Sequence, residues 1–392
     1  MKTTLIAASL LLLPLSAQAQ MASAPAPVAA SAAPVSALIV PESIAREAIL
    51  IDLNTGTVLY EKNADQRTPT ASMSKTMTAY MVFDALKSGR ITLETKVPIS
   101  ERAWRMQGSK TFVELGNQVK VDDLIQGMLV QSGNDATVAL AEAVGGTEDG
   151  FAAMATQRAQ QLGMKNSNFA NATGWPDPNH YSTVRDLSIL AQHIIQDFPE
   201  YYHYFSQREF TYHGIRQQNR DPLLSMNMGA DGLKTGHTEE NGFGIIASAI
   251  QNGRRLLLVV NGLNTDKERG DEAARLMLWG FNSTTAYPVL KAGQVVDAAA
   301  IWLGSAASVP LVAQNDVTIS MLRETQSNLK AEVILNEPVP APVTAGQELG
   351  KLRVTAPGME PHEYPLYAKN DVAALGFMGQ LRAKAHHFIF GE

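Results

Sequence analysis

Residues 59–80 read LYEKNADQRTPTASMSKTMTAY, and the spacing of the apolar residues changes within this stretch. The segment that leads into it, Glu47 to Lys62, alternates around the turn residues Asn54-Thr55-Gly56, a pattern typical of a β-hairpin. From Met73 to Met81 the apolar residues recur at helical spacing, and Lys87-Ser88-Gly89 is a helix-ending signal. A hairpin followed directly by a long helix predicts a domain that contains both a sheet and helices.

The rest of the chain extends this pattern in two parts. Further helices are predicted over 121–130, 135–144 and 271–280, and a second hairpin over 242–260 with the turn Gln251-Asn252-Gly253. Beyond about Pro288, short β-like runs alternate with Pro, Gly and Asn. We therefore predict an α/β (α+β) domain over 40–284, an antiparallel sheet covered by helices, and then a small all-β sandwich over 285–370.

Length and composition agree with an exported two-domain protein. The chain has 392 residues, a net charge of -6 and no cysteine. The charge does not indicate nucleic-acid binding, and the absence of cysteine excludes a thiol nucleophile and a thiolate metal site. Lys2, an apolar run and the small residues up to Ala19 predict a signal peptide over 1–19. Residues 20–39 are rich in Ala and Pro and are interpreted as a linker.

The first candidate site is Ser72-Met73-Ser74-Lys75, at the predicted start of the first long helix. A lysine three residues after a serine lies on the same helical face, so its amine can reach the hydroxyl. Such a lysine must be neutral to accept a proton, which requires a lowered pKa. The pattern is weak alone, and Ser327-Asn328-Leu329-Lys330 repeats it among β-like segments, where no capped helix follows.

Two other short elements add to this site. Ser132-Gly133-Asn134 lies between two predicted helices, where a turn with a helix cap is the alternative interpretation. Lys234-Thr235-Gly236-His237 leads into a predicted strand. Lysine and threonine at a strand edge can hold a carboxylate, and Gly236 would let a substrate backbone approach closely. Together the three elements supply a nucleophile, a base, oxyanion donors and a carboxylate clamp for acyl transfer.

Longer stretches make the resemblance specific. Besides residues 59–80, the stretches 130–142, 162–187 and 231–249 resemble the low-molecular-mass penicillin-binding proteins, the serine D-Ala-D-Ala carboxypeptidases of the S11 peptidase type. One departure is Thr173-Gly174-Trp175, where that family frequently has His-Gly-Leu. The resemblance implies removal of the terminal D-alanine from peptidoglycan stem pentapeptides, and acylation by β-lactams.

The resemblance also implies a role for each site residue. Ser72 is the nucleophile, Lys75 takes its proton, and Ser132 relays a proton to the leaving nitrogen. Asn134 orients the substrate amide and Lys75, and Gly236 belongs to the substrate-binding strand. Lys234 and Thr235 bind the terminal carboxylate, while the backbone N–H groups of Ser72 and His237 form the oxyanion hole. No cofactor and no metal is expected, because the histidines show no metal-binding spacing.

Several alternatives are considered. A β-lactamase that uses a glutamate to activate water is disfavoured, since residues 166–186 contain no glutamate. A D,D-endopeptidase of peptidoglycan crosslinks would share all three elements, and a non-catalytic penicillin-binding scaffold would be expected to lack part of them. In the tail, 371–392, apolar residues from Phe377 to Ile389 share one helical face. This predicts an amphipathic helix in peripheral contact with the inner membrane, on its periplasmic face.

Overall fold

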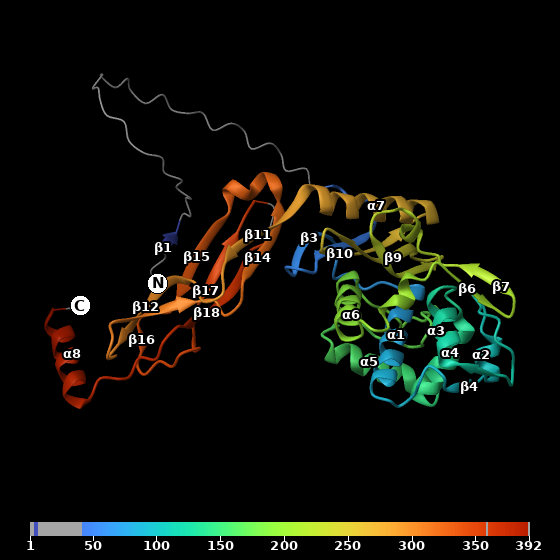
Figure 1. Ribbon diagram of the computed structural model, residues 1–392, viewed down its shortest axis with the longest axis horizontal. Coiled ribbons are helices and arrows are strands. Elements are labelled where there is room, and N and C mark those ends of the chain that lie inside the picture. The colour runs from blue at the N-terminus through green and yellow to red at the C-terminus, as the bar shows by residue number, and fades with distance from the viewer. Residues whose placement is uncertain (1–3, 7–40, 358–359, 391–392) are drawn as a thin grey trace, which may run out of the picture. The chain divides into compact units, whose positions relative to one another are not determined.

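A computed structural model describes residues 4–6, 41–357 and 360–390. The chain divides into two compact units, one over Pro41–Thr285 and the other containing the chain from Ala286 on (Figure 1). The first unit contains a five-stranded antiparallel sheet. Its strands, in spatial order, are β3 (Thr57–Lys62), β2 (Glu47–Asp52), β10 (Arg254–Leu263), β9 (Gly242–Gln251) and β8 (Ala230–Thr238).

Both faces of this sheet are buried. Side chains along its central strand β10 point alternately to one face and the other. Leu257 and Val259 point into the larger core, which the helices on one face complete. Leu256 and Leu258 point the other way, into the core that α7 (Asp266–Ser283) covers. Figure 1 shows α7 on one side of the sheet and the remaining large helices on the other: α1 (Lys75–Lys87), α3 (Val121–Leu129), α4 (Asn134–Gly145), α5 (Glu148–Gln161) and α6 (Val184–Asp197).

Short elements complete the first unit. These are η1 (Ala71–Ser74), β4 (Lys96–Pro98), α2 (Glu101–Arg105), β5 (Gln118–Lys120), η2 (Tyr202–Ser206), β6 (Glu209–Tyr212), β7 (Ile215–Gln218) and η3 (Pro222–Ser225). Both predicted hairpins are confirmed, as is the helix that ends before Gly89. The helix predicted over 271–280 is longer than expected, because Thr265 accepts the Glu268 N–H at 3.0 Å and caps it at Asp266.

The second unit is built from strands. Its larger sheet has, in spatial order, β1 (Thr4–Ile6), β15 (Lys330–Leu335), β17 (Glu348–Thr355), β18 (His362–Ala368), β13 (Ser308–Val312), β12 (Val295–Trp302) and β16 (Val339–Pro340). A pair formed by β11 (Thr284–Leu290) and β14 (Val317–Leu322) shares its core, which includes Leu290, Ile319 and Leu352. The predicted all-β domain is thus confirmed as two layers around one core.

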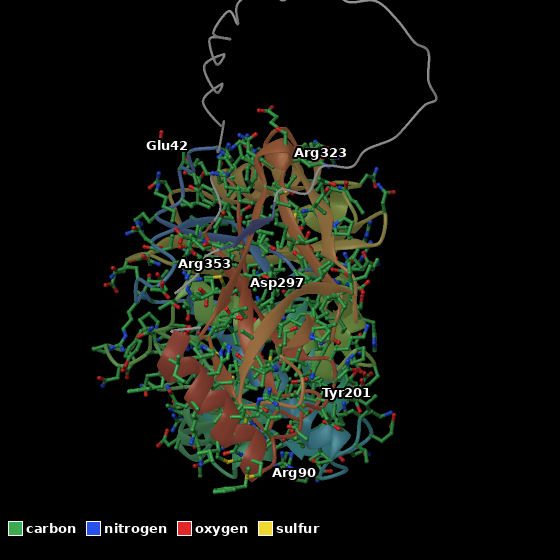
Figure 2. The ribbon with its side chains drawn as sticks, turned by 90° about the vertical axis from the view of Figure 1, so that its left-hand side faces the viewer. Glu42, Arg90, Tyr201, Asp297, Arg323 and Arg353 are labelled. Carbon is green, nitrogen blue, oxygen red and sulfur yellow. The ribbon has the colours of Figure 1, made fainter. Side chains whose placement is uncertain are left out.

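Opposite charges on neighbouring strands of this domain match their register. Arg353 on β17 lies directly opposite Glu363 on β18, and its guanidinium donates to the carboxylate at 2.7 Å. Lys351 donates to the same carboxylate at 3.0 Å. Figure 2 labels Arg353 among the side chains of this domain. A one-residue slip would move these side chains to the opposite face, so the pairs support one register.

The chain ends in α8 (Phe377–Phe390), which confirms the predicted terminal helix. Five of its large apolar side chains are exposed to solvent: Phe377, Met378, Leu381, Phe388 (91% exposed) and Ile389. Within the described ranges, none of the helices combines the length and the apolarity that crossing a bilayer requires. The predicted cleavage after Ala19 and the predicted linker lie outside the described residues, whereas Thr4–Ile6 pairs with β15 as strand β1.

Candidate active site

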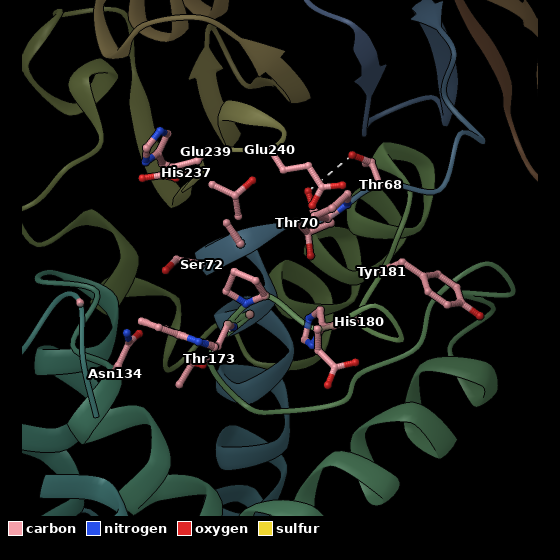
Figure 3. A pocket seen from close by; sticks show the side chains of 18 of the residues that line it. Thr68, Thr70, Ser72, Asn134, Thr173, His180, Tyr181, His237, Glu239 and Glu240 are labelled. Carbon is pink, nitrogen blue, oxygen red and sulfur yellow. Dashed lines mark hydrogen bonds between the residues drawn. The ribbon is translucent and has the colours of Figure 1, made fainter. Parts of the chain in front are cut away.

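The candidate nucleophile, Ser72, lies on a short turn that precedes α1. Ser72 is half-buried within η1, whose other three residues are buried. Ala71, just before it, has a φ of 47°, so the backbone bends sharply at the serine. Ser72 lines an open cleft of about 1090 Å³ (Figure 3). The predicted position of the serine at a helix start is confirmed, with the serine inside a 3-10 turn that leads into the α-helix.

Lys75 is fully buried at the first position of α1, and four oxygens surround its amine. The Nζ atom lies 2.7 Å from Ser72 Oγ, 2.7 Å from Asn134 Oδ1, 3.3 Å from the Thr173 carbonyl and 3.4 Å from Ser132 Oγ. A neutral amine has two N–H bonds and one lone pair. Because the amide and carbonyl oxygens can only accept, they take both hydrogens, and the lone pair is left for the Ser72 hydroxyl.

Ser132 lies in the loop between α3 and α4, and Asn134 is the first residue of α4. Ser132 has a φ of 61°, a conformation that few non-glycine residues adopt. The Asn134 amide nitrogen donates to the Gln107 carbonyl at 2.6 Å, which fixes its oxygen toward Lys75. The neighbouring Asp135 carboxylate accepts backbone N–H groups of residues 111–113 at 2.8 to 3.2 Å. This network holds segment 107–113 against the loop.

Lys234 reaches the same point from strand β8. Its Nζ donates to Ser132 Oγ at 3.0 Å and to the Thr235 carbonyl at 3.1 Å. Ser132 therefore bridges the two lysines, and both lysine side chains are buried. Thr235 is buried beside Lys234, while His237 is exposed and its ring stacks on Phe243 with centroids 4.0 Å apart. The three sequence elements thus meet at one place.

The structure gives a different reason for glycine at position 236. A Cβ there would lie 2.8 Å from the Thr70 carbonyl oxygen and 3.1 Å from the Met73 backbone nitrogen. Thr70 immediately precedes η1, the turn that carries Ser72, and Met73 lies within it. Gly236 is therefore required by the packing of β8 on η1 within the protein, whereas the sequence suggested an approach of substrate backbone.

The electrostatics favour a neutral Lys75. Burial is the largest cause of the low pKa of Lys75, which lies well below its usual value, and the charges of Lys234 and Arg220 lower it further. Burial also lowers the pKa of Lys234, to about 7, with Arg220 and Arg269 adding to the effect and Asp221 opposing it. The repulsion between lysines expected from the sequence acts on Lys75, but it is second to desolvation.

The loop 171–182 forms one wall of the cleft, and none of its residues was among the candidate site residues predicted from the sequence. Thr173 contacts Lys75 through its carbonyl, so its difference from the family's usual histidine leaves this contact in place. The Asn171 Oδ1 accepts the N–H groups of Gly174 at 2.8 Å and Trp175 at 3.0 Å, which winds the loop tightly. The Trp175 side chain is 44% exposed at the rim.

Buried His180 connects this loop to η1, the turn that carries Ser72. Its Nε2 lies 2.8 Å from Ser74 Oγ, and its Nδ1 accepts the Ala170 N–H at 3.2 Å. Burial lowers the pKa of His180 to about 4, so the ring is neutral and its Nε2–H donates to Ser74. A histidine after Pro-Asn gives no such signal in the sequence, because its partner Ser74 is more than a hundred residues away.

Figure 3 shows the cleft from close by, with Ser72 and Asn134 at one end and Tyr181 at the other. The second Ser-x-x-Lys, Ser327 to Lys330, lies in the β domain, on η4 (Arg323–Asn328) and β15. No α-helix follows it, as the sequence indicated. Among the described residues there is no cluster of His, Cys, Asp or Glu that could hold a metal ion.

The comparisons with known proteins agree with this fold. The D-alanyl-D-alanine carboxypeptidase family, peptidase S11, matches residues 33–265, and the C-terminal domain of penicillin-binding protein 5 matches residues 285–374. The D-alanyl-D-alanine carboxypeptidase DacA of Haemophilus influenzae is 40% identical over 347 residues, 87% of this chain and 88% of the relative. DacA of Escherichia coli K12 is 35% identical over 362 residues, 89% and 90% of the two chains.

Solved structures show the same likeness. Penicillin binding protein 5 from Haemophilus influenzae superposes with a TM-score of 0.76 at 40% identity, over 85% of this chain and 98% of that one. Penicillin-Binding Protein D2 from Listeria monocytogenes, in its ampicillin-bound form, superposes with a TM-score of 0.56 at 30% identity, over 61% and 98%.

The fold and the site together define a serine hydrolase of the penicillin-binding class, with a β-rich C-terminal domain. The chain belongs to the S11 family of serine-type D-alanyl-D-alanine carboxypeptidases.

Proposed function

We propose that this carboxypeptidase removes the terminal D-alanine from peptidoglycan stem pentapeptides through an acyl-enzyme on Ser72. The observation that carries the proposal is the 2.7 Å contact between Ser72 Oγ and a fully buried Lys75 amine of low pKa. A neutral amine at this distance can take the hydroxyl proton as the oxygen attacks.

In the acylation step, Ser72 Oγ attacks the carbonyl carbon of the penultimate D-alanine and its proton passes to Lys75. Lys234 donates to Ser132 Oγ at 3.0 Å, so the Ser132 O–H remains available as a donor. Ser132 is 3.4 Å from Lys75, close enough to pass a proton from that amine to the leaving nitrogen. Asn134 orients Lys75 and the substrate amide. Water then hydrolyses the ester and releases Ser72.

The remaining site residues bind charge. Lys234 and Thr235 hold the terminal carboxylate of the substrate, with Gly236 allowing their strand to pack on the nucleophile turn. The backbone N–H groups of Ser72 and His237, two residues that line the cleft, stabilise the oxyanion of the tetrahedral intermediate. β-Lactams resemble the acyl-D-Ala-D-Ala unit, and the relative from Listeria monocytogenes was solved with ampicillin bound. β-Lactams are therefore expected to acylate Ser72.

The test is release of D-alanine from a peptide ending in Lys-D-Ala-D-Ala, comparing the protein with its Ser72→Ala variant. The second Ser-x-x-Lys offers a matched control, since Ser327 lies in the β domain. We expect Ser72→Ala to abolish release and penicillin acylation, and Ser327→Ala to leave both unchanged. Acylation by penicillin without release would favour a non-catalytic scaffold, and cleavage of crosslinked dimers alone would favour an endopeptidase.

We further propose export to the periplasm, where α8 attaches the protein to the inner membrane. Exposed apolar side chains, among them Phe377, Leu381 and Phe388, support this proposal. Moving such side chains from water into a lipid surface lowers the free energy of the protein. The test is co-sedimentation of the protein with vesicles of anionic phospholipid. Phe377→Asp with Phe388→Asp should leave the protein in the supernatant and its peptidase activity unchanged. Equal sedimentation of both forms would refute attachment through α8.

A further inference from the structure

The cleft extends well beyond the reacting groups. Ser72 lies near one end of it and Tyr181 at the other (Figure 3). On β8 the clamp residues Lys234 and Thr235 come first, and residues 237–240, which line the cleft, follow them. Because the clamp takes the terminal carboxylate, the part of the stem peptide that precedes D-Ala-D-Ala must leave in the other direction, into this cleft.

Trp175 is held firmly at the rim of the cleft. Its backbone N–H donates to Asn171 Oδ1 at 3.0 Å and to Thr173 Oγ1 at 3.1 Å, and its carbonyl accepts the Asn171 amide at 2.9 Å. A Cβ on Gly108 would lie 3.2 Å from the Trp175 ring atom Cζ3 and 3.0 Å from Asn134 Nδ2. The indole thus reaches from loop 171–182 to segment 107–113, beside the Asn134 amide.

The packing of the loop does not by itself explain an indole at this position. The hydrogen bonds that hold Trp175 use only its main chain, so they would form with any side chain. The ring remains 44% exposed although one edge contacts Gly108, and it lines the cleft. Trp175 also stands where the family frequently has leucine. The tryptophan therefore presents an aromatic surface to whatever enters the cleft.

The charges that line the cleft favour a cation. Three carboxylates, those of Asp177, Glu239 and Glu240, line it together with one guanidinium, that of Arg67. Arg67 lies at the far end, where its carbon Cζ is 4.8 Å from the centroid of the Tyr181 ring. A cleft whose lining carries an excess of one charge attracts the opposite charge. The lining therefore favours an ammonium group over a carboxylate.

We propose that Trp175 is a specificity-determining residue: its indole binds the amine-bearing side chain of the residue that precedes D-Ala-D-Ala. The methylene groups of such a side chain pack on the apolar ring. Its ammonium is attracted by the face of the indole and by the negative charge of the cleft. The preferred substrates are thus stem peptides whose diamino acid has a free amine. This inference rests on the proposed function, because it places the stem peptide in the cleft.

The side chain at position 175 should set this preference in a graded way. Trp175→Leu keeps an apolar surface but removes the aromatic face that attracts a cation. Trp175→Phe keeps an aromatic face, although a tryptophan ring attracts cations more strongly. Trp104 offers a matched control, since its indole is 42% exposed on α2 and it is not among the residues that line the cleft.

The experiment measures kcat/KM for D-alanine release at pH 7 on two peptides, Nα-acetyl-L-Lys-D-Ala-D-Ala and its Nε-acetylated form. The two differ by one charge on the same side chain. The protein should prefer the free amine, and the ratio of the two kcat/KM values should fall roughly two- to fivefold in Trp175→Leu. Trp175→Phe should lose less of the preference, and Trp104→Leu should keep the original ratio.

The outcomes separate this inference from the function on which it rests. Release from both peptides with equal kcat/KM, or a preference that Trp175→Leu retains, would show the inference wrong and leave the carboxypeptidase activity standing. An equal loss on both peptides in Trp175→Leu and Trp175→Phe would show a structural role only. No release from either peptide by the unaltered protein would instead overturn the proposed function itself.

Discussion

Replacing Asn134 by aspartate tests whether Lys75 acts as a neutral base. The Asn134 amide oxygen lies 2.7 Å from Lys75 Nζ, so Asn134→Asp puts a negative charge next to the amine with almost no change in size. An opposite charge this close raises the pKa of an amine by roughly 1–3 units. The variant also loses the donor to the Gln107 carbonyl, which lies 2.6 Å away.

The sign of the effect is set by the protonation state that the reaction needs. Because Lys75 accepts a proton only when neutral, the acylation rate rises with pH through its pKa. A higher pKa moves this acidic limb to higher pH by roughly 1–3 units. For every unit by which the Lys75 pKa exceeds the assay pH, the rate falls about tenfold. Activity should therefore return in alkaline buffer.

The assay is the second-order rate of acylation by a fluorescent penicillin, measured from pH 6 to 10. Asn134→Leu is the matched control, since it removes the same two contacts and adds no charge. We expect a lower rate in the control with its acidic limb unmoved or shifted down. A lower rate in Asn134→Asp with an unmoved limb would refute the assignment of Lys75 as the base, and leave Asn134 with a purely steric role.

Two further predictions concern the packing around the site. A Cβ on Gly174, whose φ is 78°, would lie 1.8 Å from the Ala71 carbonyl oxygen, so Gly174→Ala should displace the loop that contacts Lys75 and slow acylation at least tenfold. The control is Gly146→Ala, at a φ of 76° with no neighbour within 4 Å, which should be acylated at the normal rate. Equal acylation rates in the two variants would contradict the clash. Asp135→Ala leaves four backbone N–H groups, those of residues 111–113 and of Ala136, without their acceptor. It should lower the free energy of unfolding by at least about 3 kcal/mol in urea titrations, with a smaller loss for Asp135→Asn. A loss below about 1 kcal/mol would show that water replaces the carboxylate.

Most of the fold could be predicted where the signal is local. Both hairpins carry their own turn residues, and the helix after Ser72 carries its own apolar spacing and its glycine stop. Helices α5 and α6 were not predicted. Each begins at a threonine cap, Thr147 and Thr183, but the buried face of α5 consists largely of alanines around Phe151, so its apolar pattern is faint.

The site residues likewise fall into those that the sequence indicated and those that it did not. Its residue types and their order along the chain were visible in the sequence, because a Ser-x-x-Lys, a Ser-x-Asn and a Lys-Thr-Gly are each contiguous. Arg220 and His180 were missed, since neither lies in a recognisable pattern. Their roles come from contacts with partners far away in the sequence, such as the one between His180 and Ser74.

The sequence by itself therefore indicated most of the elements, the two-domain order and the candidate reacting groups, since neighbouring residues carry that information. Only the tertiary structure decided the chemistry of those groups. The pKa of Lys75 depends on its burial and on charges brought by Lys234 and Arg220, from segments more than a hundred residues away. Desolvation and Coulomb energy depend on distances in space, and those distances exist only once β8, η1 and the loop 171–182 have packed together.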